Sequence, residues 1–324
     1  MKKYTVTVPS SDSKNLLNTV VWEPDEGAKA VLQLVHGMAE HIERYSDFAE
    51  YLTNYGYIVI GHDHLGHGKT AKSKNDLGYF ADENGDEIVI DDVYRVTQYA
   101  RETWPELPNY ILGHSMGSFF VRQYLTQYSS NVHGAIIVGT GWFPKVLADM
   151  GVLLAKREIK KHSPHYVSKM LVNMSIGQYN KAFEPARTPC DWLSRDMGIV
   201  DAYMADPLCG FDFTAGAYKD LFTVIQKIAS NSNLDGIRKR LPILITSGEE
   251  DPVGGTKACN KLINQYYMAG LQNSNLKLFA YDRHEILNEI DKSMVYLYIK
   301  NWLDNRVGEA EVYKNLSRIS EYGE

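Results

Sequence analysis

Short apolar runs recur along the chain and alternate with stretches whose apolar residues fall three and four positions apart. Six runs have the continuous hydrophobicity of strands buried on both faces, and they lie at residues 30–35, 57–60, 110–112, 135–138, 243–246 and 276–280. Residues 4–8 and 17–22 suit an antiparallel pair that precedes them. Because buried strands separated by amphipathic helices form parallel sheets covered on both sides, the pattern predicts an α/β fold with a mostly parallel central sheet flanked by helices.

Three helical stripes lie between and after these runs. The first ends at Gly56, since glycine commonly terminates a helix, and its apolar positions are Tyr45, Phe48, Ala49, Leu52 and Tyr55. The second is expected to begin at Asp91 and Asp92, whose carboxylates can cap a helix, and to end at Pro105. The third, near the end of the chain, has its apolar positions at Leu287, Ile290, Met294 and Leu297.

The alternation of apolar runs and helical stripes stops between residues 142 and 230, where helical stripes, prolines and aromatics continue without a convincing strand. This segment separates the run at 135–138 from the run at 243–246, so one sheet would be assembled from both sides of it. We therefore predict a first part of the core at 1–141, an inserted helical cap or lid at 142–235, and a second part of the core at 236–324.

Composition narrows the class of protein. The 324 residues are 44% hydrophobic and 23% charged, which is typical of a globular chain, and no apolar run is long enough to span a bilayer. A net charge of -6 argues against a nucleic-acid partner. The first residues lack the apolar centre of a signal peptide and the three cysteines are odd in number, so we expect a cytoplasmic protein with reduced thiols.

The residues Gly113, His114, Ser115, Met116 and Gly117 directly follow the apolar run at 110–112. In a Gly-x-Ser-x-Gly turn the chain passes sharply from a strand into a helix, and the serine hydroxyl projects above the sheet. The helix is present in the pattern, with apolar residues at Phe119, Phe120, Tyr124, Leu125 and Tyr128. Ser115 is therefore the predicted nucleophile, and Gly113, His114 and Gly117 complete its elbow.

A serine nucleophile needs a histidine base, and the histidine needs a carboxylate that orients it. Asp251 follows the run at 243–246, and His284 follows the run at 276–280. The carboxyl ends of parallel strands meet at one edge of a sheet, so these residues can converge on Ser115. The order Ser, Asp, His is that of the α/β-hydrolase fold, although Glu249 and Glu250 compete for the acid role.

Two backbone amides are needed to bind the negatively charged oxygen of the tetrahedral intermediate. Met116, directly after the nucleophile, is one expected donor. The other is expected from the loop after the run at 30–35, where Met38 is the candidate.

Three motifs in chain order make the sequence similar to a known family. They are His36-Gly37-Met38-Ala39-Glu40-His41 with Arg44 and Tyr45, Asp63-His64-Leu65-Gly66-His67-Gly68, and residues 113–117. Together with Asp251 and His284 they resemble monoacylglycerol lipases and bacterial lysophospholipase-like α/β-hydrolases. The resemblance implies an α/β-hydrolase fold with a helical cap and a soluble serine hydrolase that acts on esters of a single acyl chain.

The segment around residue 65 partly resembles two other kinds of site, a zinc site and a phosphate-binding loop. His62, His64 and His67 approach the zinc motif His-x-His-x-Asp-His, but Gly66 occupies the position of its aspartate. Residues 66–70 end like a phosphate-binding loop whose first glycine is replaced by Asp63. We expect no metal and no organic cofactor.

The sequence thus predicts an ester hydrolase that forms an acyl-enzyme on Ser115, with a monoacylglycerol or a lysophospholipid as substrate. The alternatives are an esterase for short or aromatic soluble esters, an amidase or peptidase of the same fold, and a ligand-binding relative without catalysis. Residues 145–174 of the cap carry six basic and two acidic residues beside an apolar stripe. This segment can make transient contact with an anionic membrane surface, and it can equally be an ordinary solvated helix.

Overall fold

A single sheet of eight strands forms the centre of the computed structural model, which describes residues 1–321 and the side chains of residues 1–309. The strands lie in the order β1-β2-β4-β3-β5-β6-β7-β8. β1 and β2 pair antiparallel, as do β2 and β4, and all other neighbours are parallel. The strand bounds are β1 (Lys2–Pro9), β2 (Leu16–Glu23), β3 (Ala30–Val35), β4 (Tyr57–His62), β5 (Asn109–His114), β6 (Gly134–Val138), β7 (Ile243–Gly248) and β8 (Ser274–Phe279). The predicted sheet and the antiparallel pair before it are confirmed.

Helices cover both faces of the sheet, and each face has its own hydrophobic cluster because successive side chains of a strand point to opposite sides. Leu32 and Leu34 pack with α1 and α9, whereas Val31 and Val35 pack with α2, α3 and α8. The helix bounds are α1 (Ser46–Thr53), α2 (Gly85–Thr103), α3 (Met116–Tyr128), α4 (Lys145–Lys161), α5 (Lys169–Ser175), α6 (Met197–Ala205), α7 (Ala215–Ile228), α8 (Gly255–Met268) and α9 (Lys292–Glu321). Short 3-10 turns are η1 (Ile42–Tyr45), η2 (Lys74–Asp76), η3 (Ser129–Asn131), η4 (Tyr179–Phe183), η5 (Asn231–Gly236) and η6 (Ile286–Asn288).

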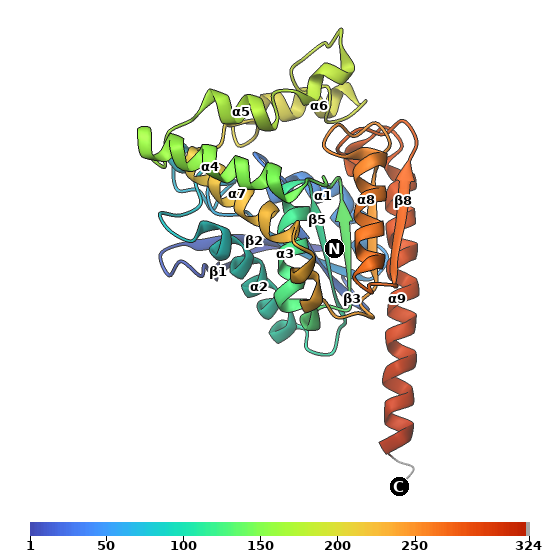
Figure 1. Cartoon of the computed structure of the whole chain (residues 1–324). Coiled ribbons are helices and arrows are strands. Elements are labelled where there is room, and N and C mark those ends of the chain that lie inside the picture. The colour runs from blue at the N-terminus through green and yellow to red at the C-terminus, as the bar shows by residue number, and fades with distance from the viewer. Residues whose placement is uncertain (322–324) are drawn as a thin grey trace.

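The segment between β6 and β7 contains helices and turns but no strand. In Figure 1 its helices α4, α5 and α6 form a layer at one end of the molecule, and α7 leads back toward the core. β6 and β7 are nevertheless direct neighbours, with Ala135 opposite Ile243. The sheet is therefore built from both sides of the inserted segment, as the apolar runs predicted; residues 322–324 of the predicted second core part lie outside the described residues.

The predicted start of the second helix is wrong. α2 begins at Gly85, with Asn84 at its N-cap position, so Asp91 and Asp92 lie inside the helix. The carboxylate of Asp92 is buried and accepts hydrogen bonds from the Ser10 hydroxyl at 2.9 Å and the Ser11 amide at 2.6 Å. Asp92 therefore fixes the loop after β1 to the helix instead of capping it.

The apolar face predicted for the last helix is also wrong. α9 begins only at Lys292, and Ile290, Met294 and Leu297 are exposed. The buried face is the stripe that includes Val295 and Ile299 and packs against the sheet. At the first helix, Tyr55 lies beyond the end of α1 and is exposed.

Among the described residues, no helix is both long and apolar enough to cross a membrane.

Candidate active site

Ser115 lies at the sharp junction of β5 and α3. Its backbone has φ 53° and ψ -120°, in the left-handed half of conformational space where a residue with a side chain is strained. The Ser115 amide donates to the Val138 carbonyl at 3.0 Å, which ties the turn to the neighbouring strand β6. The predicted strand, turn and helix are therefore present, and the strain is concentrated on the serine.

Glycine is required on both sides of Ser115 because the backbone segments approach too closely for a side chain. A Cβ atom at Gly113 would lie 2.3 Å from the Gly117 carbonyl oxygen. At Gly117 it would lie 2.1 Å from the carbonyl oxygen of Val35. The two glycines thus allow α3 to begin directly against β3 and β5.

His284 and Asp251 form a buried pair in the loops after β8 and β7. The His284 Nδ1 atom lies 2.9 Å from Asp251 Oδ1. The carboxylate also accepts hydrogen bonds from the Val253 amide at 2.9 Å and the Ser247 hydroxyl at 3.0 Å. Burial raises the pKa of Asp251, but His284 and these hydrogen bonds outweigh it and lower the pKa below its usual value. Glu249 and Glu250 are exposed, so the structure brings Asp251, and neither glutamate, to the histidine.

Ser115 and His284 line the same cavity, which has a volume of about 280 Å³. Met38 and Met116 line it as well, and the cap contributes Trp192. The Trp192 ring lies 4.9 Å from the His284 ring between their centroids. Five of the predicted site residues therefore line one cavity, with Asp251 behind the histidine; they are Ser115, His284, Met38, Met116 and His114.

In the loop after β3, Met38 lies between two residues whose backbone amides already donate hydrogen bonds to side chains. The Gly37 amide donates to Glu40 Oε1 at 2.6 Å, and the Ala39 amide donates to His67 Nε2 at 3.2 Å. Met116 is the first residue of α3, and the first amides of a helix have no partner within the helix. This geometry suits Met38 and Met116 as the pair of amide donors toward the cavity.

The sequence analysis did not predict a buried network beside Ser115. Arg44 binds Glu285 through two parallel hydrogen bonds of 2.7 Å and binds Glu40 at 2.6 Å. The Tyr45 hydroxyl donates to Glu40 at 2.8 Å and lies 3.0 Å from Nδ1 of His114. Glu40 and Arg44 are four positions apart, a spacing typical of ion pairs. This spacing is the only feature of the sequence that could have predicted part of the network.

The network affects the protonation of His114, the neighbour of Ser115. Burial lowers the pKa of His114, but the hydrogen bond and charge of Glu40 outweigh it and raise the pKa above its usual value. The Nε2 atom of His114 lies 3.3 Å from the His284 carbonyl, which can only accept. Burial raises the pKa of Glu40, but the Arg44 guanidinium and His114 lower it well below its usual range. Because Nε2 of His114 donates to the His284 carbonyl, His114 holds the backbone of the loop that carries His284.

The inserted segment between β6 and β7, the predicted cap, contacts the loops that carry Met38 and His284. The Glu285 amide donates to the Leu193 carbonyl at 2.7 Å. The Ala39 carbonyl accepts hydrogen bonds from the Gly210 amide at 3.0 Å and the Tyr203 hydroxyl at 3.1 Å. Ala39 has φ 52°, a left-handed conformation that is costly for alanine, so these cap contacts help to fix a strained loop.

Two of the three histidines that resemble zinc ligands have side-chain contacts within the core, and His64 Nε2 lies 3.3 Å from the His36 carbonyl oxygen. Neither ring nitrogen of His62 has a hydrogen-bond partner among the described residues. His67 accepts from Ala39, and the His64 amide donates to Nε2 of His36 at 3.1 Å. Burial lowers the pKa of His62 to about 3 and that of His67 to about 4, so both are neutral near pH 7. The Asp63 carboxylate accepts hydrogen bonds from the backbone amides of Ile42 and Lys69. It therefore occupies the centre of the loop that resembles a phosphate-binding site.

Comparison with known proteins places this arrangement in a family. Residues 26–291 match the family described as "Serine aminopeptidase, S33". The chain is 27% identical over 290 residues to a monoacylglycerol lipase of Mycolicibacterium smegmatis, covering 87% of this chain and 91% of that protein. It is 25% identical to the monoglyceride lipase of Rattus norvegicus over 94% of both chains.

Among solved structures, a thermostable carboxyl esterase from Bacillus coagulans in complex with glycerol superposes with a TM-score of 0.87 and 25% identity. The match covers 95% of this chain and 99% of the esterase. The family match spans most of the chain, and the sheet with its helices on both faces agrees with the relatives' fold. The chain therefore belongs to the serine aminopeptidase S33 family, as a monoacylglycerol lipase-like α/β-hydrolase of the carboxylic ester hydrolase class.

Proposed function

We propose that the enzyme hydrolyses esters of a single acyl chain, namely monoacylglycerols or lysophospholipids, through an acyl-enzyme on Ser115. The observation that carries this proposal is the cavity that both Ser115 and His284 line, with Asp251 hydrogen-bonded behind the histidine. The monoacylglycerol lipases and the glycerol-bound esterase among the similar proteins support the choice of substrate class.

The proposed reaction has two halves. His284 removes the hydroxyl proton of Ser115 as the oxygen attacks the ester carbonyl, and the Met38 and Met116 amides bind the resulting oxyanion. His284 then gives the proton to the departing alcohol as the ester bond breaks. Water, deprotonated by His284, releases the fatty acid and restores Ser115. Asp251 holds the imidazole in the orientation that both halves need.

The walls of the cavity favour an acyl chain. Large apolar side chains from the core and the cap line the space, including Phe119, Leu147, Phe222, Ile225 and Val253. An alkyl chain that moves from water onto such walls gains about 0.8 kcal/mol for each buried methylene. We therefore expect kcat/KM to rise with chain length until the cavity is full.

The family description raises an aminopeptidase as the second candidate. Such an enzyme needs a free carboxylate that binds the amino terminus of its substrate. The carboxylates on the cavity wall are Glu40 and Glu285, and both are paired with Arg44. This pairing favours ester hydrolysis over removal of amino-terminal residues.

A chain-length series tests the proposal. We would measure kcat/KM for p-nitrophenyl esters from acetate to palmitate, and for amino-acid p-nitroanilides as the aminopeptidase control. Activity should peak at medium or long chains, and Ser115→Ala should lose several orders of magnitude in kcat, up to about 10⁶-fold. Asp251→Asn should lose about 10⁴-fold because the imidazole takes the wrong tautomer. A peak at acetate would reject the lipid substrate, and equal inertness of wild type and Ser115→Ala would reject the hydrolase.

We also propose that α4 rests on an anionic membrane surface while substrate enters. Val146 and Leu153 of this helix are 68% and 67% exposed, and Lys160 and Lys161 lie in its last turn. Apolar side chains beside lysines are typical of helices that lie in the interface of a bilayer. Leu147 of the same helix lines the cavity, so a surface-bound α4 would bring the entrance to the lipid.

Sedimentation with vesicles tests this contact. Binding to phosphatidylcholine vesicles should increase when phosphatidylglycerol is included, and Leu153→Ser should weaken it several-fold. Met268→Ser is the matched control, because Met268 is an exposed residue of α8 outside the cap. Equal loss in both variants, or no effect of the anionic lipid, would remove the membrane proposal without affecting the chain-length result.

The cytoplasmic compartment stays a proposal, supported by the three cysteines, Cys190, Cys209 and Cys259, which are all free thiols.

A further inference from the structure

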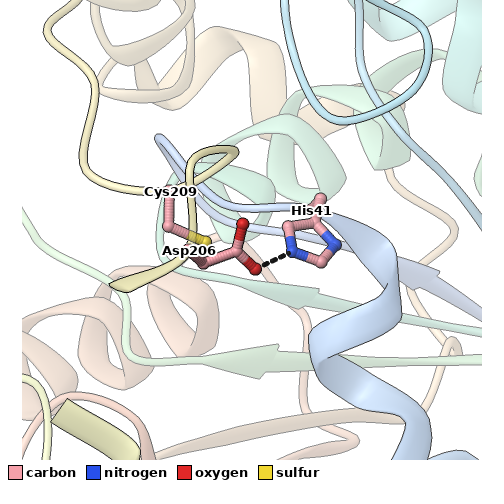
Figure 2. Close-up of side chains that lie close together, drawn as sticks. All are labelled: His41, Asp206 and Cys209. Atoms are coloured by element: carbon pink, nitrogen blue, oxygen red, sulfur yellow. Dashed lines mark hydrogen bonds and ion pairs between the residues drawn. The ribbon is translucent and has the colours of Figure 1, made fainter. Parts of the chain in front are cut away.

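His41, Asp206 and Cys209 gather at a seam between the core and the cap. His41 precedes η1 in the loop that also carries Met38, whereas Asp206 and Cys209 follow α6. Figure 2 shows the three side chains close together, with the His41 ring hydrogen-bonded to the Asp206 carboxylate. His41 Nε2 lies 2.9 Å from Asp206 Oδ2, and one ligand atom from each residue lies within 4.8 Å of the others.

We propose that this cluster binds a zinc ion that joins the cap to the loop of Met38. An imidazole nitrogen, a carboxylate oxygen and a thiolate sulfur are all ligands of zinc, and three protein ligands leave the fourth position for water. Zinc bonds of about 2.0–2.3 Å place tetrahedral ligand atoms roughly 3.3–3.8 Å apart. The cluster can therefore close around the ion with shifts of about 1 Å.

The surroundings of the cluster can accept a cation. The nearby Arg44 guanidinium is held between Glu40 and Glu285, so its single charge is already opposed by two carboxylates. Asp206 adds a further negative charge. The side chains of His41 and Asp206 are 12% and 31% exposed, which gives an ion a path from solvent and shields it once bound.

The ligands are also oriented by the local backbone. Asp206 Oδ1 accepts the Leu208 amide at 2.8 Å, which leaves Oδ2 turned toward His41. The Cys209 amide donates to the Asp206 carbonyl at 3.0 Å, so one tight turn carries both cap ligands. Outer contacts of this kind fix the direction of a ligand before the metal arrives.

Binding replaces one contact and releases one proton. Zinc takes the place of the hydrogen bond between His41 and Asp206, and the proton on His41 Nε2 moves to Nδ1 through solvent, which frees the Nε2 electron pair. The Cys209 thiol loses its proton to solvent, and each ligand atom donates an electron pair to the ion. The neighbouring contacts of the Ala39 carbonyl with Gly210 and Tyr203 are then held as well. A bound ion therefore fixes the cap against the loop of Met38 and slows every step that needs the cap to move.

The first test uses the wild-type protein and cobalt chloride as a spectroscopic substitute for zinc. Cobalt should produce tetrahedral visible bands and a near-ultraviolet thiolate-to-cobalt absorption, which zinc chloride then abolishes. Zinc should also slow alkylation of Cys209 by iodoacetamide, read by peptide mass spectrometry, and leave Cys190 unchanged. Absence of the thiolate absorption, or equal protection of both cysteines, would overturn the proposal.

The second test compares Cys209→Ser with Cys190→Ser, the matched control, because Cys190 is also a half-buried cap thiol but lies outside the cluster. Zinc should raise the midpoint of thermal unfolding of wild type and Cys190→Ser. Cys209→Ser should bind zinc at least 10- to 100-fold more weakly, and Asp206→Asn should weaken it in the same direction. Retained affinity in Cys209→Ser would contradict the site. These measurements need no substrate, so their outcome is independent of the proposed lipid hydrolysis.

Discussion

At the scale of single residues, a severe steric constraint at the candidate active site acts on Gly117. Its missing side chain lets the first turn of α3 lie directly against the end of β3, where a Cβ atom would meet the Val35 carbonyl oxygen at 2.1 Å and the His36 carbonyl oxygen at 2.5 Å. Backbone oxygens cannot rotate away as a flexible side chain can. Any larger residue must push α3, and with it Ser115, away from the sheet.

Gly117→Ala should therefore destabilise the protein by about 2–3 kcal/mol, as overpacked sites do, and lower kcat as well. Gly308→Ala is the control, because the added Cβ at Gly308 in α9 meets nothing within 4 Å. Alanine in an open helix position should stabilise by about 0.5–1 kcal/mol. Urea unfolding of both variants checks the opposite signs, and a loss of similar size in both would contradict the steric explanation.

The candidate catalytic residues could be predicted from the sequence because each follows an apolar run that the sheet brings to one edge. Chain order left Asp251 in competition with Glu249 and Glu250 for the acid role. The structure separates them, because Asp251 is buried against His284 and both glutamates are exposed. The bond between Arg44 and Glu285 could not be predicted, since it joins residues 241 positions apart. Such pairs depend on how loops meet in space, which local pattern does not specify.

At the scale of elements, Arg195 fastens the cap to the loops behind His284. It lies between η4 and α6, and its guanidinium contacts Asp282, Glu289 at 3.1 Å and Asp291 at 2.8 Å. Asp282 and Glu289 are buried. Burial and the neighbouring carboxylates raise the pKa of Asp282 to about 7, against the opposing effect of Arg195. Arg195 thus compensates much of the negative charge of the three carboxylates that it contacts.

Removing this guanidinium should be costly. Arg195→Met leaves two carboxylates buried without their partner, and we expect a loss of about 2–4 kcal/mol in the free energy of unfolding at pH 7. Arg187→Met is the matched control within the cap, because Arg187 pairs with Asp201 at an exposed site, where an ion pair contributes less than about 1 kcal/mol. Equal effects of the two substitutions would show that Arg195 is only a surface charge.

Helices and strands could be predicted from the sequence where burial of apolar side chains alone determines their position. The strands β3, β4, β5, β6 and β7 are buried along their whole length, so a continuous apolar run identifies them, whereas β8 at the edge of the sheet is only partly buried. The start of α2 was missed because aspartates are good helix caps in general, whereas Asp92 is used by Ser10 and Ser11 across the fold. The face of α9 was missed because two apolar stripes compete along it, and packing against the sheet selects the one with Val295 and Ile299.

At the scale of the whole molecule, the two parts of the core are also joined by an ion pair at the sheet's face. Asp304 of α9 accepts hydrogen bonds from Lys29 at 2.6 Å and from the Tyr57 hydroxyl at 2.7 Å, both from the first part of the chain. Lys300 contacts it at 2.8 Å from the preceding turn of α9. Partial burial raises the pKa of Asp304, but these three donors lower it to about 2.

A lowered carboxylate pKa gives stability that is present above the unfolded value of about 3.9 and is lost as pH falls toward the folded value. Asp304 is 31% exposed, so solvent screening reduces its contribution to about 1 kcal/mol. Asp304→Asn should therefore be less stable than wild type at pH 7 by about this amount, and the difference should shrink between pH 4 and pH 2. Unfolding in urea across that range checks it; a difference independent of pH would contradict it. Asp235→Asn, at an exposed carboxylate, should show little change at any pH.

The position of the inserted segment between β6 and β7 has a consequence for divergence within the family. The two flanking strands are held in register by their own hydrogen bonds, from Ala135 opposite Ile243 to Val138 opposite Thr246. Neither the frame of the sheet nor the turn at Ser115 depends on how long the intervening segment is. Evolution or laboratory grafting can therefore replace this segment by another and keep the sheet, provided that the new segment restores the contacts that Gly210 and Tyr203 make with the Ala39 carbonyl.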